Sequence, residues 1–242
     1  NSDWYYNYAR ISPSVPVFPE LLQRAGYHTG AETANVFLIA ERGFGRGFDD
    51  FHNEGGEVGP HAELTRAGNV TQKALAWLRR DDRQPFFLWV HYLDPHTPYD
   101  SPDTPLKLRK RYPQQWETKR KFWEKLKQSS EPAVMRRYQD FCRYMYGEEV
   151  RYVDRWIGKL LAALQQKGLD RNTLIVITAD HGEELFEHGG FEHGHTMHEE
   201  LLWVPLLVRW PQKTSADKEI TQTVALSSLS GTFLSFAGAQ PA

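Results

Sequence analysis

Seven of the ten histidines in this 242-residue sequence fall in two short stretches, His91–His96 and His181–His198. The second stretch opens within the run Asp-His-Gly-Glu-Glu at 180–184. A carboxylate supplies negative charge to a divalent cation, and a neutral imidazole adds a further ligand. Asp180 and His181 are therefore candidate metal ligands. Taken alone, Asp-His-Gly is equally typical of a helix start, with Asp180 as the N-cap and the glycine in a tight turn.

Each histidine stretch follows an apolar run that is typical of a buried strand. The runs are Phe86 to Val90, which begins after Pro85, and Leu174 to Thr178. Because parallel strands end at the same edge of a sheet, the residues that follow them can converge on one site. We therefore expect these two strands to be adjacent or close in one sheet, with both histidine stretches at its carboxyl edge.

Apolar periodicity elsewhere predicts helices that cover this sheet. The clearest helix is 146–167, where apolar residues recur at helical spacing until Gly168. Asn69 is a candidate N-cap for a helix at 70–80. Other helices are expected at 16–24 and 226–236, and other strands at 28–36 and 204–208. This alternation predicts the α/β class, with a mainly parallel sheet sandwiched between helices.

The composition is that of an ordinary soluble domain, with 40% hydrophobic and 25% charged residues and a formal net charge of −2. This balance does not favour nucleic acid or a membrane surface as a partner. No run of about 18 apolar residues is present, so we expect no membrane span. Cys142 is the single cysteine, which excludes an intrachain disulfide, and it is expected to be a buried thiol.

The segment 100–140 departs from the alternating pattern. Lysines and arginines crowd into it, including Lys119, Arg120 and Lys121, and tryptophans stand between them. One interpretation is a basic helical excursion exposed to solvent. The other is a lid whose positive charge attracts an anionic substrate. Because the segment starts soon after His96, we expect it to lie near that histidine.

The stretch Leu174 to Pro205, which reads LIVITADHGEELFEHGGFEHGHTMHEELLWVP, closely resembles the sulfatase family of the alkaline phosphatase superfamily. Four further segments match the same family in the same order, at 25–30, 43–49, 87–99 and 148–161. The resemblance covers nearly the whole chain outside 100–140. It implies an alkaline-phosphatase/sulfatase-like α/β fold, with residues 1–242 forming part of a catalytic domain.

The resemblance also implies a set of site residues. In this family an Asp and a neighbouring Asn or His join two earlier acidic residues around one cation, usually calcium. The later pair corresponds to Asp180 and His181. His96 and His193 correspond to residues that contact the transferred sulfate group, and His195 is the next best match to His193.

The remaining candidates have two interpretations. Asn35 is a candidate substrate-binding residue, because residues 31–36 replace a Gly-Lys-x-His element of the family. His188, His195 and His198 could instead be surface histidines or supports for other residues.

The family nucleophile stands in a Cys-or-Ser, x, Pro, x, Arg motif, whose first residue is converted to formylglycine. This motif is absent: Cys142 is followed by Arg-Tyr-Met, and Ser14-Val-Pro has no following arginine at the required position. The early acidic pair is absent too. We therefore expect a truncated chain without the N-terminal nucleophile segment, which alone is inactive and holds calcium weakly or not at all.

The resemblance implies a sulfuric ester hydrolase that acts on a small-molecule or glycan sulfate ester with a divalent cation. One alternative is a phosphodiesterase, phosphonate hydrolase or phosphotransferase of the same superfamily. Another is a non-catalytic, sulfatase-like binding protein. No nucleic-acid recognition motif accompanies the basic segment, so nucleic acid is not an expected partner. The family resemblance would suit a periplasmic, extracellular or lysosomal-type compartment.

Overall fold

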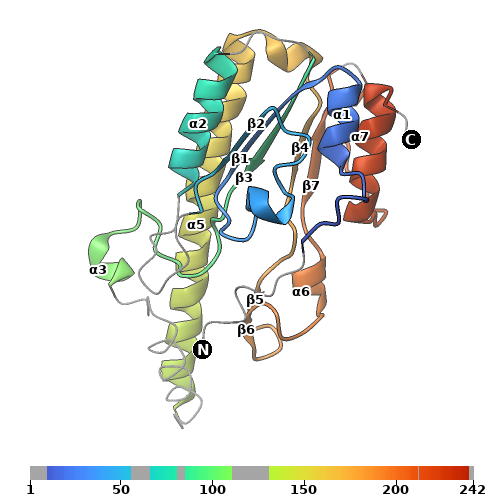
Figure 1. Cartoon of the computed structure of the whole chain (residues 1–242). Helices are drawn as coiled ribbons and strands as arrows, with labels where there is room; N and C mark the ends of the chain where they lie inside the picture. The colour runs from blue at the N-terminus through green and yellow to red at the C-terminus, as the bar shows by residue number, and fades with distance from the viewer. Residues whose placement is uncertain (1–9, 56–65, 81–84, 111–130, 212, 240–242) are drawn as a thin grey trace. The chain divides into compact units, whose positions relative to one another are not determined.

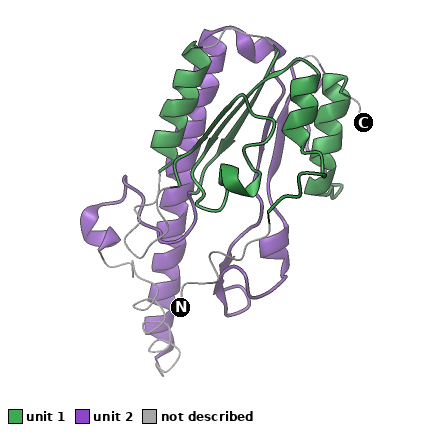
Figure 2. Cartoon of the chain, viewed as in Figure 1, with its two compact units in different colours: residues 1–93, 222–242 green, residues 94–221 purple. Residues whose placement is uncertain are grey.

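The structure is a computed structural model that describes residues 10–55, 66–80, 85–110, 131–211 and 213–239. The chain forms two compact units (Figure 2). The first unit comprises residues 1–93 and 222–242, and the second comprises residues 94–221. The first unit is thus built from both ends of the chain.

The first unit is organised around a three-stranded parallel sheet (Figure 1). β1 (His28–Thr33) lies between the other two strands and pairs with both in parallel register. The expected strand at 28–36 ends early because the Asn35 side chain forms a turn, in which Oδ1 accepts a hydrogen bond from Phe37 N at 2.9 Å. The outer strands are β2 (Asp50–Asn53) and β3 (Phe86–His91).

Helices cover both faces of this sheet. Successive side chains of a strand point to opposite faces, so each face carries side chains that can pack against a helix. On one face, α2 (Ala67–Arg80) packs so closely that a Cβ at Gly30 would lie 2.6 Å from the Trp77 ring. On the other face, Phe18 and Phe87 meet edge to face at 5.2 Å. That face is covered by α1 (Phe18–Arg24) and α7 (Leu229–Ala237), which follows the short helix η4 (Leu226–Ser228).

Asn69 does not cap α2. Helical hydrogen bonds begin at the Arg66 carbonyl, which accepts from the backbone N–H groups of Asn69 and Val70. The helix starts at Ala67, so Asn69 lies in its first turn and the expected N-cap was wrong.

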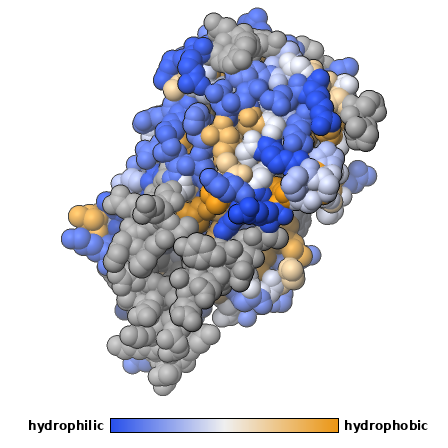
Figure 3. Space-filling view, in the orientation of Figure 1, coloured by the Kyte–Doolittle hydropathy of each residue, from blue (hydrophilic) through white to orange (hydrophobic). Residues whose placement is uncertain are grey.

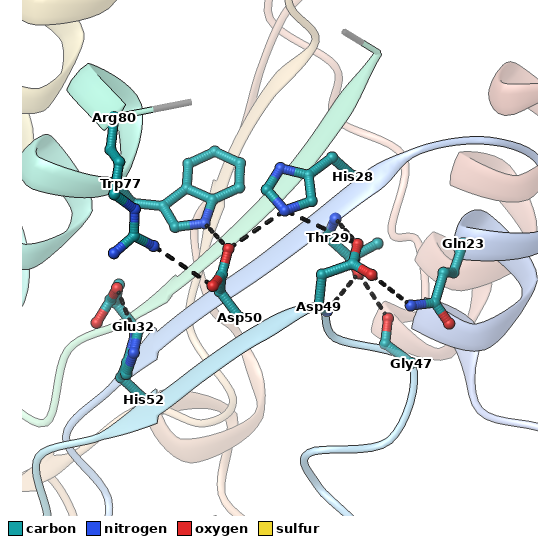
Figure 4. Close-up of polar contacts among 10 residues, drawn as sticks. All are labelled: Gln23, His28, Thr29, Glu32, Gly47, Asp49, Asp50, His52, Trp77 and Arg80. Atoms are coloured by element: carbon teal, nitrogen blue, oxygen red, sulfur yellow. Dashed lines mark hydrogen bonds and ion pairs between the residues drawn. The ribbon is translucent and has the colours of Figure 1, made fainter. Parts of the chain in front are cut away.

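Polar side chains on the α2 face of the sheet bond to one another (Figure 4). Trp77 Nε1 donates to Asp50 Oδ2 at 2.9 Å, and His28 Nε2 lies 3.2 Å from the same oxygen. Farther along, His52 Nδ1 and Glu32 Oε1 are 3.0 Å apart. Burial in this layer raises the pKa of Glu32.

The second unit contains the long helix α5 (Pro132–Gln166). The helix expected at 146–167 therefore begins at Pro132, and residues 132–140 are not part of a separate excursion. Tyr138 and Cys142 extend its buried stripe towards the N-terminus, which explains the greater length. Cys142 is a fully buried free thiol, as predicted.

The rest of the 100–140 segment is described only in part. It contains the short helix α3 (Leu106–Arg109). Lys119, Arg120 and Lys121 lie outside the described residues, so the proposed basic lid stays a prediction.

The strands of the second unit pair antiparallel. β4 (Ile175–Thr178) pairs with β7 (Leu206–Arg209) and, among the described residues, is not in the sheet that contains β3. The expectation that the strands at 86–90 and 174–178 share one sheet was therefore wrong. The same apolar run predicted a buried strand, but β4 is only partly buried among the described residues and Thr178 is exposed. An apolar run also does not show which strand it joins. The other elements are η3 (Leu169–Asn172), β5 (Glu184–Leu185), β6 (Phe191–Glu192) and α6 (Glu199–Leu202).

The parallel sheet and its covering helices confirm the predicted α/β class. Among the described residues, the helices are too short or too polar to span a bilayer. On the face drawn in Figure 3, hydrophilic residues make up most of the described surface, and apolar residues show in smaller areas between them.

Candidate active site

The candidate metal ligands lie in a loop that follows β4. No helix follows this loop, so the alternative role of Asp180 as a helix cap was wrong; the next element is the short strand β5. Gly182 was expected to permit a tight turn into a helix. The structure requires a glycine here because the backbone comes very close to another segment. Its N–H donates to Leu201 O at 2.8 Å, and a Cβ on Gly182 would lie 1.9 Å from Glu200 O.

Asp180 and His181 present one oxygen and one nitrogen to a common point. His181 Nδ1 lies 2.7 Å from Gly182 O, so Nδ1 carries the proton in neutral imidazole and Nε2 carries the lone pair. Nε2 lies 3.9 Å from Asp180 Oδ2, a separation that a cation about 2.0–2.6 Å from each atom can bridge. The Asp180 side chain is 77% exposed, so the cation would retain water or other ligands.

His193 is positioned by the β5–β6 hairpin. Glu184 pairs with Glu192 in this hairpin, so the next residues outward, Glu183 and His193, stand opposite each other. His193 Nδ1 lies 2.8 Å from Glu183 Oε1. The Glu183 side chain is only 6% exposed, so this carboxylate orients the imidazole from a buried position.

Three of the predicted histidines come together. The His193 ring centroid lies 4.3 Å from that of His181 and 5.1 Å from that of His96. His96 Nδ1 is 2.7 Å from Thr97 O, which places the Nδ1 proton towards that carbonyl. The cluster thus presents several imidazole nitrogens beside the Asp180 carboxylate and can donate or accept protons.

His195 belongs to a different contact. Its Nε2 lies 2.9 Å from Oε2 of Glu184, whose side chain is fully buried. Burial raises the pKa of Glu184, but hydrogen bonds from His195, Gly190 N and His188 N outweigh that effect, and the pKa lies below its ordinary value. His195 therefore pairs with a buried carboxylate, as a supporting residue would.

A second group of possible metal ligands consists of Glu184, His188 and Glu200. One ligand atom from each lies within 4.8 Å of the other two. His188 Nδ1 is 2.7 Å from Glu200 Oε1, and this bond raises the pKa of His188. The His188 ring also stacks on His198 at 3.7 Å.

Asn35 belongs to the first unit, where its side chain holds the turn after β1. The first unit also contains an apolar cavity of about 400 Å³, whose lining includes Phe18, Phe87 and Phe233. The cavity lining contains none of the predicted site residues. The substrate-binding role of Asn35 therefore stays a prediction.

The sequence analysis missed two residues of the cluster. Glu183 was given no role, but its Oε1 lies within hydrogen-bond distance of His193 and its Oε2 accepts from Tyr99. The Tyr99 hydroxyl donates to Glu183 Oε2 at 2.6 Å. Glu183 and Tyr99 lie within the two histidine-containing motifs, and this was the signal that could have identified them. Their contact with each other could be seen only in the folded chain.

The chain matches a known protein family. The model of the Sulfatase family matches residues 4–239. An endo-4-O-sulfatase from Bacteroides thetaiotaomicron is 31% identical over 138 residues, a match that covers 55% of this chain and 25% of the relative. The chain thus spans only a part of the length of that enzyme.

Solved structures share the fold. One, described as in complex with its substrate D-glucosamine-2-N,6-O-disulfate, has a TM-score of 0.73 and 23% identity, and the match covers 97% of this chain and 63% of that chain. A phosphonate monoester hydrolase from Silicibacter pomeroyi has a TM-score of 0.69 and 20% identity, over 96% of this chain and 59% of that chain.

Proposed function

Because the chain belongs to the sulfatase family, we propose that it carries the cation-binding and proton-transfer part of an enzyme that hydrolyses sulfate esters. The observation that carries this proposal is the position of His193, which Glu183 holds beside both His96 and His181. A buried carboxylate that fixes an imidazole beside other imidazoles is an arrangement suited to an oriented proton donor.

We propose the following roles, which this geometry supports. His193 and His96 hydrogen-bond the sulfate oxygens and protonate the leaving oxygen. Glu183 accepts from His193 Nδ1 and thereby keeps Nε2 directed at the substrate. Imidazole N–H groups that face one point can donate hydrogen bonds to a bound anion.

Sulfatases generally use a divalent metal, and Asp180 and His181 fit such an ion through Oδ2 and Nε2. We propose that the ion is calcium, which accepts oxygen ligands in large number and can retain water on the exposed side of Asp180. When bound there, the ion offsets the negative charge of the sulfate oxygens. The proposed nucleophile is a formylglycine supplied from outside residues 1–242.

The proposed substrate class is a sulfated carbohydrate. One relative, an N-acetylglucosamine-6-O-sulfatase from Bacteroides thetaiotaomicron, is named for a carbohydrate sulfate and is 38% identical over 104 residues, which are 43% of this chain. Phosphonate monoester hydrolysis is the second candidate, because an enzyme with that activity shares the fold.

The test uses the full-length protein loaded with calcium. Hydrolysis of glucosamine 6-sulfate and of a phenylphosphonate monoester is compared for the wild type, Asp180→Asn and His193→Ala. We expect faster turnover of the sulfate, loss of calcium binding with Asp180→Asn, and about a 10²–10⁴-fold lower kcat with His193→Ala. Faster phosphonate turnover would favour the second candidate, and the absence of both activities would favour a binding protein. Full activity of either variant would refute the residue assignment.

A further inference from the structure

We propose that Glu184, His188 and Glu200 bind one transition-metal dication such as Zn²⁺, at a site separate from Asp180 and His181. One oxygen from each carboxylate and one imidazole nitrogen lie within 4.8 Å of one another. The proposal is independent of sulfate hydrolysis, because it concerns a different set of ligand atoms.

Glu184 is held in place as a rigid ligand. Its side chain is fully buried, and its Oε1 accepts hydrogen bonds from Gly190 N at 2.7 Å and His188 N at 3.2 Å. Its Oε2 lies 2.9 Å from His195 Nε2. Carboxylates that ligate metals are commonly fixed by outer hydrogen bonds of this kind, and Oε2, which has the single contact to His195, keeps a further lone pair for the ion.

The glycine at position 190 leaves the space that this arrangement needs. A Cβ at Gly190 would lie 2.5 Å and 2.7 Å from the two carboxylate oxygens of Glu184, and 2.6 Å from His195 Nε2. The backbone at position 190 thus lies closer to the Glu184 carboxylate than a residue with a Cβ would permit. The close approach at Gly190 is evidence, separate from the three-residue cluster, that the Glu184 carboxylate is held in one position.

The other two ligands converge on the same point from separate elements. His188 comes from the loop between β5 and β6, and Glu200 comes from α6. His188 Nδ1 and Glu200 Oε1 are already 2.7 Å apart, so a cation replaces the proton between them after only a small movement. The His188 ring stacks on His198 with an angle of 13°, which limits its rotation.

The donor set selects the class of ion. One imidazole and two carboxylates suit Zn²⁺ and related transition metals, which bind three protein ligands and a water. Calcium takes about six to eight oxygen ligands, more than two carboxylates supply. Because the bound ion would join the β5–β6 hairpin to α6, it would stiffen the segment that carries His193.

The experiment is a zinc titration of the full-length protein, stripped of metal with a chelator and then supplied with excess calcium to occupy other sites. We expect one tight equivalent of Zn²⁺ and a rise in melting temperature. Affinity should fall by about tenfold or more in His188→Ala and Glu200→Gln, since each removes a ligand. Co²⁺ should bind with the same stoichiometry and give visible absorption of a low-coordinate site.

Two control variants distinguish zinc binding at this site from other effects on zinc affinity. Glu199→Gln removes the same charge from the exposed neighbour of Glu200 and should leave zinc affinity unchanged. Asp180→Asn should also retain zinc binding, whether or not it abolishes calcium binding. Equal zinc affinity in the wild type, His188→Ala and Glu200→Gln would refute the site, as would loss of zinc binding in Asp180→Asn. His188 is half exposed, so its replacement tests the site with little change to the core.

Discussion

At the scale of single residues, buried carboxylates determine where the histidines of this protein point. Glu183 orients His193, and Glu184 orients His195, although the two acids are adjacent in sequence. Each carboxylate accepts from an imidazole and from at least one other donor, so each is fixed before a substrate or ion arrives. The different contacts of His193 and His195 therefore originate in their acidic partners.

The first prediction concerns Glu183. In the full-length enzyme, Glu183→Gln should lower kcat by about tenfold to a hundredfold with little change in KM, because the amide fixes His193 less firmly. Steady-state kinetics on a sulfate ester measure this, and the pH profile should shift because His193 loses an anionic partner. Glu199→Gln, on an exposed side chain, is the control. An unchanged pH profile would contradict the positioning role.

The second prediction concerns Glu32 in the first unit. Burial raises its pKa above the ordinary value of 4.5, so the folded state retains the proton to a higher pH than the unfolded state does. The free energy of unfolding contributed by this group is therefore greatest at low pH and falls as pH rises from 4.5 through the raised pKa.

Glu32→Gln removes this titration. Its stability relative to the wild type should increase across the same pH window, as measured by urea unfolding at a series of pH values. The Glu32 Oε2 atom, which has no hydrogen-bond partner among the described residues, adds to the disadvantage of the ionised form. A stability difference that does not vary with pH would contradict the raised pKa.

At the scale of elements, close backbone approach matters more than turn conformation. The loop after β4 contacts α6 at Gly182, where no Cβ can be placed without meeting the Glu200 carbonyl. The same glycine was expected to permit a tight turn into a helix. The structure instead makes it the point at which two segments of the second unit touch.

The third prediction compares two glycines. Gly182→Ala should destabilise the protein by about 1–3 kcal/mol, because the added methyl group displaces α6. Gly158→Ala should stabilise it by about 0.5–1 kcal/mol, because Gly158 lies inside α5 with open space at its Cβ. Chemical denaturation of both variants measures the difference. Equal effects of the two substitutions would show that the contact at Gly182 is unimportant.

At the scale of the whole molecule, the two ends of the chain build one compact unit. Leu234 of α7 packs with Leu21 and Leu22 of α1, although these residues are far apart in sequence. The second unit has its own core around Tyr99 and Met145. Each unit therefore has its own apolar cluster among the described residues.

The fourth prediction concerns the packing of α7 against α1 in the first unit. Leu234→Ala should lower the free energy of unfolding by about 2–5 kcal/mol, because it opens a cavity against α1. Phe236→Ala, at a side chain that is 47% exposed, should have a much smaller effect. Hydrogen exchange should show the loss of protection in α1 and β1 first. A larger effect of Phe236→Ala would contradict the packing of α7.

Local sequence patterns were sufficient for much of the fold. Apolar runs predicted β3 and β4, since a run of apolar residues is a property of a short segment. They did not predict that β4 joins β7 or that α5 begins at Pro132. Strand partners depend on long-range register, which a single apolar run does not encode.

The sequence by itself determined the family, the α/β class and the motif that contains Asp180 and His181, because these depend on the order of neighbouring residues. Tertiary structure alone decided that Glu183 holds His193 and that Glu184, His188 and Glu200 converge. The physical reason is that a carboxylate can accept from many donors, and hairpin register and backbone approach select the one that it meets.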